Sequence, residues 1–213
     1  MNHMKLQRIT LACLPAILLA ACTLALAGRN EPVHTYVLGL DSTDGPPVAG
    51  RACAAALLVN VPQASSGFDT PRMVYLLRPH ETSHYATSQW ADTPARMLAP
   101  LLVQAVERTG AWQAVARIPS TIQGDYRLDS EDLVLAQEFF PQPSRVRLTL
   151  RVQLVGLRDQ RIIGTHAFEV LEEAPSHDAY GGVVAANRAV TTLLERIAAW
   201  LRERLHEREG RDC

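Results

Sequence analysis

The sequence predicts an α+β fold, a mostly antiparallel sheet with one mid-chain helix and one long C-terminal helix packed on it. Three observations lead to this class. Residues 145–154 alternate strictly between apolar and polar side chains, which is typical of a strand with one buried face. Residues 178–207 carry an apolar stripe at helical spacing. Short segments rich in β-branched and aromatic residues, interrupted by loops that contain Gly or Pro, precede them.

Four strands are predicted before the mid-chain helix. Their segments combine β-branched, aromatic and apolar residues, which favour a pleated and half-buried surface. Loops at Gly45-Pro46-Pro47 and at Pro62 interrupt them, because Pro and Gly disfavour a continuing strand. The predicted strands are 34–38, 56–61, 73–77 and 81–89.

The mid-chain helix is predicted to begin at Asp92-Thr93-Pro94, where a capping residue precedes Pro at a first-turn position. It ends at Gly110. Its apolar stripe consists of Met97, Leu98, Leu101, Leu102 and Ala105. The strands predicted after it are 112–118, 125–129 and 133–140, followed by a hairpin of 145–154 and 161–171 that turns at Arg158-Asp159-Gln160. The stripe of the last helix is Val190, Leu194, Ile197, Leu201 and Leu205.

Near the N-terminus, Lys5 and Arg8 precede an apolar run that ends in small residues, a pattern typical of a secretory signal peptide. Leu19-Ala20-Ala21-Cys22 closes this run and resembles the lipobox of bacterial lipoproteins. The resemblance implies cleavage before Cys22, a diacylglycerol on its thiol and an acyl chain on the new amine. Because Thr23 rather than Asp follows, it also implies sorting to the outer membrane of a Gram-negative bacterium. The domain would then face the periplasm, anchored by lipid.

Two other interpretations of the leader stay open. Ala25-Leu26-Ala27 is an A-x-A site, so cleavage after Ala27 would release a secreted protein. The apolar run from Ile9 to Ala27 has about the 20 residues that can span a bilayer, although Pro15 weakens its case as an uncleaved anchor.

Composition argues against a partner recognised by bulk charge. The formal net charge is -1, so no global basic field attracts nucleic acid. The hydrophobic fraction of 47% and the charged fraction of 20% are ordinary for a globular domain. Once Cys13 leaves with the leader and Cys22 is acylated, Cys53 and Cys213 remain. Either they form a disulfide with each other in an oxidising compartment, or Cys53 is a small buried side chain and Cys213 a free thiol at the C-terminus.

His80-Glu81-Thr82-Ser83-His84 spells H-E-x-x-H. On a helix, this spacing places two imidazoles to hold zinc and a glutamate to act as general base. Here the neighbouring Pro, Thr, Ser and Tyr residues favour a strand or loop. In a strand the two histidines lie about 13 Å apart, too far to share one zinc ion. A chance match on an exposed strand is therefore favoured, and the alternative function is a lipid-anchored zinc hydrolase.

Four residues are candidates for a partner interface. Arg145, Arg147 and Arg151 line the polar face of the alternating strand, where they could meet phosphate headgroups or an acidic partner, or form a solvated strand face. Trp90 lies at a strand-to-helix junction. Its side chain either anchors an interface, where tryptophan is enriched, or covers the core. No residue is assigned to catalysis or to a metal.

Several short motifs follow the lipobox in a distinctive order. They are Tyr36-Val37-Leu38, Val59-Asn60-Val61-Pro62, Met73-Val74-Tyr75, His84-Tyr85, Trp90-Ala91-Asp92-Thr93-Pro94, Asp125-Tyr126-Arg127-Leu128, the strand Arg145–Leu154, Phe168 and a last helix that reaches Trp200. This order, over roughly Val33 to Leu205, resembles the PqiC-like family of ABC-type transport auxiliary lipoproteins.

The resemblance implies a protein that is not an enzyme and carries no cofactor apart from the acyl chains on Cys22. It implies partnership with an MCE-domain periplasmic protein or ABC transporter subunits that move lipids or other hydrophobic molecules, and assembly as a homo-oligomer. The expected organisation is a signal peptide over 1–21, a lipidated N-terminus and tether over 22–32, the auxiliary-lipoprotein domain over 33–208 and a flexible tail over 209–213.

Overall fold

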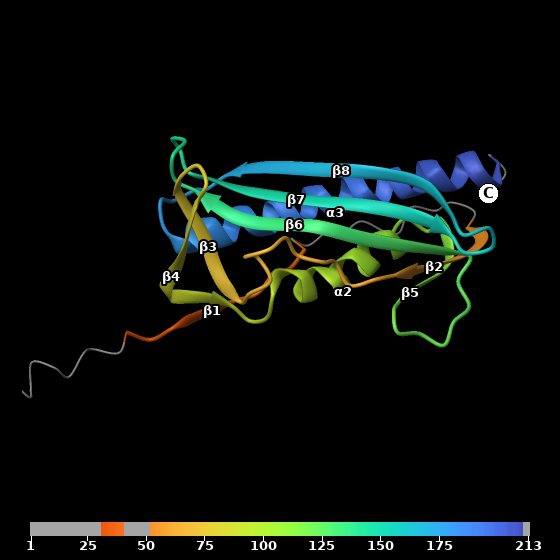
Figure 1. The fold of residues 1–213 in the computed structure, drawn as a ribbon, viewed down its shortest axis with the longest axis horizontal. Helices are drawn as coiled ribbons and strands as arrows, with labels where there is room; N and C mark the ends of the chain where they lie inside the picture. Colours follow the sequence, from red (N-terminus) through yellow and green to blue (C-terminus); the bar gives the residue numbers. More distant parts are fainter. Residues whose placement is uncertain (1–30, 41–51, 211–213) are drawn as a thin grey trace, which may run out of the picture. The chain divides into compact units, whose positions relative to one another are not determined.

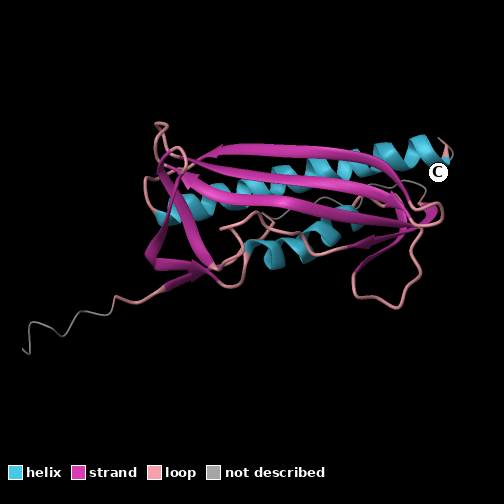
Figure 2. Cartoon of the chain, in the orientation of Figure 1, coloured by secondary structure: helices cyan, strands magenta, loops and turns pink. Residues whose placement is uncertain are grey.

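The computed structural model describes residues 31–40 and 52–210, in which eight strands form one sheet and two helices pack on it (Figure 1, Figure 2). The α+β class is thereby confirmed. The elements are β1 (His34–Tyr36), β2 (Cys53–Val59), β3 (Arg72–Arg78), β4 (Glu81–Trp90), α2 (Pro94–Glu107), β5 (Trp112–Arg117), β6 (Tyr126–Glu138), β7 (Arg145–Gly156), β8 (Arg161–Glu173) and α3 (Ala179–Glu209).

The sheet is mixed, so the prediction of a mostly antiparallel sheet is wrong. Strands β6, β7 and β8 form long antiparallel ladders, and β3 pairs with β4 in the same sense. The pairs β1–β4, β2–β5, β2–β6 and β3–β6 are parallel. Only strands joined by a tight turn are obliged to run antiparallel, whereas the longer connections here allow parallel pairing.

Strand β6 is the centre of this arrangement. Its first residues pair with β2 and its last with β3, while its other edge pairs with β7 over nearly its whole length. The sequence predicted two strands, 125–129 and 133–140, where the structure has one. A bulge between Glu131 and Val134, with Asp132 at a φ of 56°, interrupts the alternation without ending the strand.

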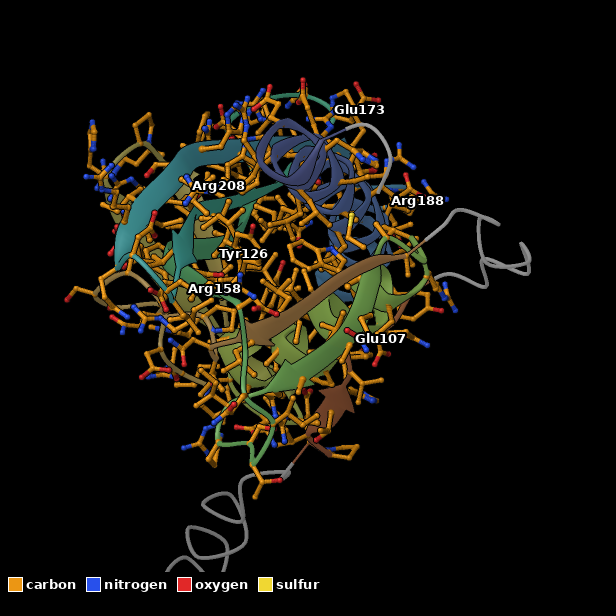
Figure 3. The ribbon with its side chains drawn as sticks, turned by 90° about the vertical axis from the view of Figure 1, so that its right-hand side faces the viewer. Glu107, Tyr126, Arg158, Glu173, Arg188 and Arg208 are labelled. Atoms are coloured by element: carbon orange, nitrogen blue, oxygen red, sulfur yellow. The ribbon has the colours of Figure 1, made fainter. Side chains whose placement is uncertain are left out.

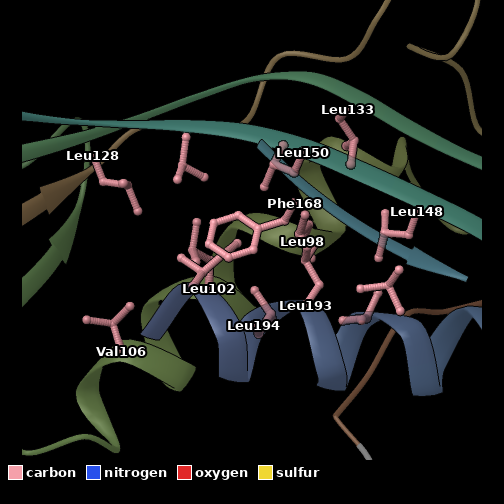
Figure 4. Packing of buried hydrophobic residues seen from close by; sticks show 14 of the residues in the cluster. Leu98, Leu102, Val106, Leu128, Leu133, Leu148, Leu150, Phe168, Leu193 and Leu194 are labelled. Atoms are coloured by element: carbon pink, nitrogen blue, oxygen red, sulfur yellow. The ribbon is translucent and has the colours of Figure 1, made fainter. Parts of the chain in front are cut away.

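The core lies between the sheet and the helices. Helix α3 packs on β7 and β8, and α2 packs on α3 and β5. The predicted alternation of β7 is confirmed, because one face of that strand is buried throughout. Figure 4 shows the packing, in which fully or nearly fully buried side chains meet from both layers: Leu98, Leu102, Val106, Leu128, Leu133, Leu148, Leu150, Phe168, Leu193 and Leu194.

Both helices begin as the sequence predicts. The Thr93 side chain accepts a hydrogen bond from the backbone N–H of Arg96, and Pro94 occupies the first turn. At α3, Asp178 Oδ1 accepts from the backbone N–H of Gly181 at 2.7 Å. This bond is the main reason that the pKa of Asp178 lies below its ordinary value. Local capping thus fixes where each helix starts.

Candidate functional site

The predicted lipid-attachment residue, Cys22, and the rest of the lipobox lie outside the described residues. Cys13 and Cys213 also lie outside them. Cys53, at the start of β2, is buried and disulfide-bonded. Within the part of the chain that the structure describes, no helix is both long and apolar enough to cross a membrane.

The H-E-x-x-H residues occupy a turn and a strand. His80 sits in the turn between β3 and β4 with a φ of 68°, and Glu81 opens β4 in an ion pair with Arg78. His84 lies within β4 opposite Val74. The strand predicted here is confirmed, and the helix on which the zinc geometry depends is not formed. Among residues 31–40 and 52–210, no group of three potential His, Cys, Asp or Glu ligands is found.

The three candidate arginines lie on the outer face of the sheet, each beside a carboxylate. Arg145 Nε and Arg147 Nε donate to the two oxygens of Glu138 at 2.8 and 2.6 Å. Arg147 also pairs with Glu169 on β8. Arg151 pairs with Glu131 on β6. The row is therefore neutralised by acidic residues from both neighbouring strands, and its contact with a partner stays a prediction.

We call the three arginines and their partners Glu131, Glu138 and Glu169 the ion-pair ladder. Glu138 is the member of this ladder most removed from solvent, with a side chain 4% exposed. Burial disfavours its charged form, but the hydrogen bonds and charges of Arg147 and Arg145 outweigh that cost. As a result, the pKa of Glu138 lies below its ordinary value. The carboxylate thus holds two guanidinium groups in fixed positions on the sheet surface.

Trp90 ends β4 and belongs to the core. Its backbone N–H donates to the carbonyl of Pro71 at 2.7 Å, and β1 runs beside it with Tyr36 as its register partner. Because the side chain is buried, the folded domain offers little of it to another molecule. A role for Trp90 at an interface stays a prediction.

A buried polar junction, not anticipated from the sequence, joins the sheet to the start of α3. Gln137 Oε1 accepts from the Tyr85 hydroxyl at 2.9 Å, and Gln137 Nε2 donates to Ser144 Oγ at 3.3 Å. A Cβ at position 182 would overlap Gln137 Oε1, so glycine lets the helix approach without displacing the hydrogen-bonded amide of Gln137. Burial raises the pKa of Tyr85, which keeps its hydroxyl protonated as a donor.

A polar pocket of about 330 Å³ opens on the outer face beside the ladder. Its lining includes Asn60, Gln63, Asp129, Glu131 and Gln153. The carboxylate of Asp129 already accepts three hydrogen bonds from Arg127, two from Nε and one from Nη2, and another from Asn60. Its charge is therefore compensated within the protein.

Charged residues gather at the end of the sheet where β6 begins. Figure 3 shows Tyr126, Arg158 and Arg208 at this end, around a small pocket that Asp125 and Asp159 also line. Arg158 donates to Asp125 at 2.8 Å and Arg208 to Asp159 at 2.5 Å. The bond from Arg208 is the main cause that lowers the pKa of Asp159. We call this region the charged end.

A comparison with known protein families identifies the family of this chain. The model of the family described as the ABC-type transport auxiliary lipoprotein component matches residues 36–198. The chain belongs to this family. The match runs from the last residue of β1 to a point within α3, so it covers nearly all of the sheet and contains the candidate interface residues. Cys22 precedes it.

Solved structures share the fold of this ABC-type transport auxiliary lipoprotein. A Xanthomonas campestris protein is 24% identical with a TM-score of 0.72, covering 84% of this chain and 99% of its own. An uncharacterized protein is 12% identical with a TM-score of 0.62, covering 80% and 99%. A hypothetical protein from Chlamydia trachomatis is 6% identical with a TM-score of 0.52, covering 72% and 98%. The search of curated proteins found no match.

Proposed function

We propose that this ABC-type transport auxiliary lipoprotein is anchored to the outer membrane and serves, without catalysis, in a lipid-transport system of the MCE and ABC type. The observation that carries the proposal is the combination of a lipobox with the family domain, only a short tether apart. Acylation of Cys22 by a diacylglycerol and an N-acyl chain holds the domain at the periplasmic face. Thr23 after the cysteine supports the outer membrane as its destination.

The accessory role is supported by how the polar groups are used. The carboxylates and arginines of the outer face pair with one another, and the buried amide of Gln137 is bonded to Tyr85 and Ser144. These contacts stabilise the sheet, and in this proposal another protein docks on it. In this proposal the domain positions its partners, an MCE-domain periplasmic protein or ABC transporter subunits, and works as a homo-oligomer. The cargo is a lipid or another hydrophobic molecule.

The anchor is tested by labelling cells with a clickable palmitate analogue and separating inner from outer membranes on a density gradient. We expect label on the processed lipoprotein, at its mature size, in the outer-membrane fraction. A Cys22→Ala variant should lose the label and fail to be processed. A Cys53→Ala variant controls for labelling at another cysteine. Label on the Cys22→Ala variant would contradict the anchor.

The partnership is tested by tagging the full-length lipoprotein, solubilising cell envelopes gently and identifying co-purified proteins by mass spectrometry. We expect an MCE-domain protein or ABC transporter subunits to be enriched over a sample from cells that express an unrelated tagged outer-membrane lipoprotein. Recovery of the lipoprotein without such a partner would overturn the transport role while leaving the anchor intact.

A further inference from the structure

Aromatic residues are concentrated at the end of the domain opposite the charged end. Four of the five tyrosines and two of the four phenylalanines of the chain lie there. They come from β1, β3, β4, the segment after β6 and the start of α3, which meet at the left of Figure 1. We define the aromatic end as His34, Tyr36, Tyr75, Tyr85, Phe139, His177 and Tyr180, together with the adjoining apolar residues Val33, Val37, Leu77 and Phe140.

The rings at the aromatic end form two groups, and the rings within each group contact one another. Tyr75 lies 4.8 Å from Tyr85 and 5.8 Å from Phe139, measured between ring centroids. Phe139 in turn lies 4.7 Å from His177. The second group joins α3 to β1, because Tyr180 at the start of α3 lies 6.2 Å from the ring of Tyr36. Because these segments are far apart in sequence, only the fold assembles this surface.

Much of the aromatic end faces solvent. The exposed fractions of Tyr180, Val37 and Leu77 are 62, 63 and 58%. Val33 and Phe140 are exposed as well. Large apolar side chains gathered in one region of a surface mark an interaction site. Tyrosine is the residue that, together with tryptophan, is enriched where a membrane meets water, because its ring is apolar and its hydroxyl is polar.

The covalent chain places this end near the membrane. Strand β1 is the element through which the tether enters the domain, and only eleven peptide steps separate Val33 from Cys22. Even fully extended, such a segment spans at most about 40 Å. In the proposed acylated protein the anchor therefore keeps β1, and with it the aromatic end, within about 40 Å of the bilayer, whereas the charged end lies at the other end of the long β6–β7–β8 ladders (Figure 1).

We propose that the aromatic end rests in the headgroup region of the bilayer, so that Leu77, Phe140 and Tyr180 contact lipid. This inference rests on the proposed acylation of Cys22. A lipid tether alone leaves the orientation of the domain free, and an apolar contact at one end fixes that orientation. The sheet then points the charged end away from the membrane, toward the periplasm and the transport partners.

The test is quenching of an added tryptophan by brominated lipid. Full-length, acylated protein is reconstituted into vesicles of phosphatidylethanolamine and phosphatidylglycerol, with or without bromine on the acyl chains near the headgroup. Leu77→Trp probes the aromatic end, and Phe140→Trp provides a second position in case one variant folds poorly. Ile162→Trp is the matched control, because Ile162 is 61% exposed and also sits near a hairpin turn, but at the charged end.

We expect brominated lipid to remove more than about half of the added fluorescence of Leu77→Trp and Phe140→Trp, since interfacial aromatic side chains lie at that depth. Ile162→Trp should be unaffected. Flotation of the same vesicles separates the two proposals. If the protein does not float with them, the anchor and this inference both fail. If it floats but the probes at the aromatic end are not quenched, or are quenched no more than Ile162→Trp, only the orientation fails. A blue shift that depends on protein density without quenching would assign this surface to a second copy instead.

Discussion

Replacing Glu138 by glutamine removes the negative charge that two arginines share on the outer face of the sheet. The glutamate side chain is 4% exposed, and those of Arg145 and Arg147 are 29% and 33% exposed. Glutamine has nearly the same shape but offers only one acceptor oxygen. One guanidinium therefore loses its hydrogen bond and faces an amide N–H₂ group, so two donors are brought together.

The cost follows from the two hydrogen bonds at 2.8 and 2.6 Å. A hydrogen bond to a charged group contributes about 1.5–3 kcal/mol to stability. One is lost and the other is weakened, while partial exposure of both arginines lets water compensate in part. We expect Glu138→Gln to lower the free energy of unfolding by about 2 kcal/mol.

The assay is urea unfolding followed by circular dichroism, at neutral pH and across acidic pH. The folded-state pKa of Glu138 is lowered, so its carboxylate stabilises the fold fully above the ordinary glutamate pKa of about 4.3. That contribution is lost as the pH falls through the folded-state value. The difference in stability between wild type and Glu138→Gln should therefore shrink below pH of about 4.

Glu131→Gln is the matched control from the same ladder. Its ion pair with Arg151 joins side chains that are 51% and 44% exposed. Such a surface pair contributes about 0–1 kcal/mol, so this variant should unfold close to wild type. Equal losses for the two variants, or a loss in Glu138→Gln that does not change with pH, would refute the role assigned to the buried carboxylate.

Three further substitutions test the fold. Gly182→Ala places a methyl group against the hydrogen-bonded amide of Gln137 and should lower the free energy of unfolding in urea by about 1–3 kcal/mol. Gly39→Ala is the control, because its methyl group meets only one side-chain atom, at 3.9 Å, and its stability should differ little from that of wild type. Leu194→Ala removes a side chain with 0% exposure and should cost about 2–5 kcal/mol; a smaller loss would mean that the core collapses around the cavity. Thr93→Ala deletes the cap of α2 and should lower the free energy of unfolding by about 0.5–1 kcal/mol. An unchanged free energy of unfolding would show that Pro94 alone determines where α2 begins.

The sequence by itself located both helices and, apart from dividing β6 in two, the strands of the described residues. The period-two pattern of residues 145–154 predicted β7, and the stripe through Leu194 and Ile197 predicted α3, because side-chain direction follows from local backbone geometry. The start of α2 was predicted from the capping residues before Pro94, since a cap acts within a few residues, and the start of α3 was predicted at about Asp178. The order of short motifs was enough to predict the family.

Only the tertiary structure decided which strands pair and what the polar residues meet. The parallel pairs, and the continuation of β6 through its bulge at Asp132, depend on contacts between distant segments, and no local pattern encodes them. The carboxylates opposite Arg145, Arg147 and Arg151 were unforeseen for the same reason: register between neighbouring strands sets which side chains lie side by side. The aromatic end is likewise built from segments that adjoin only after the sheet has formed, because ring packing depends on distance in space and not on position in the chain.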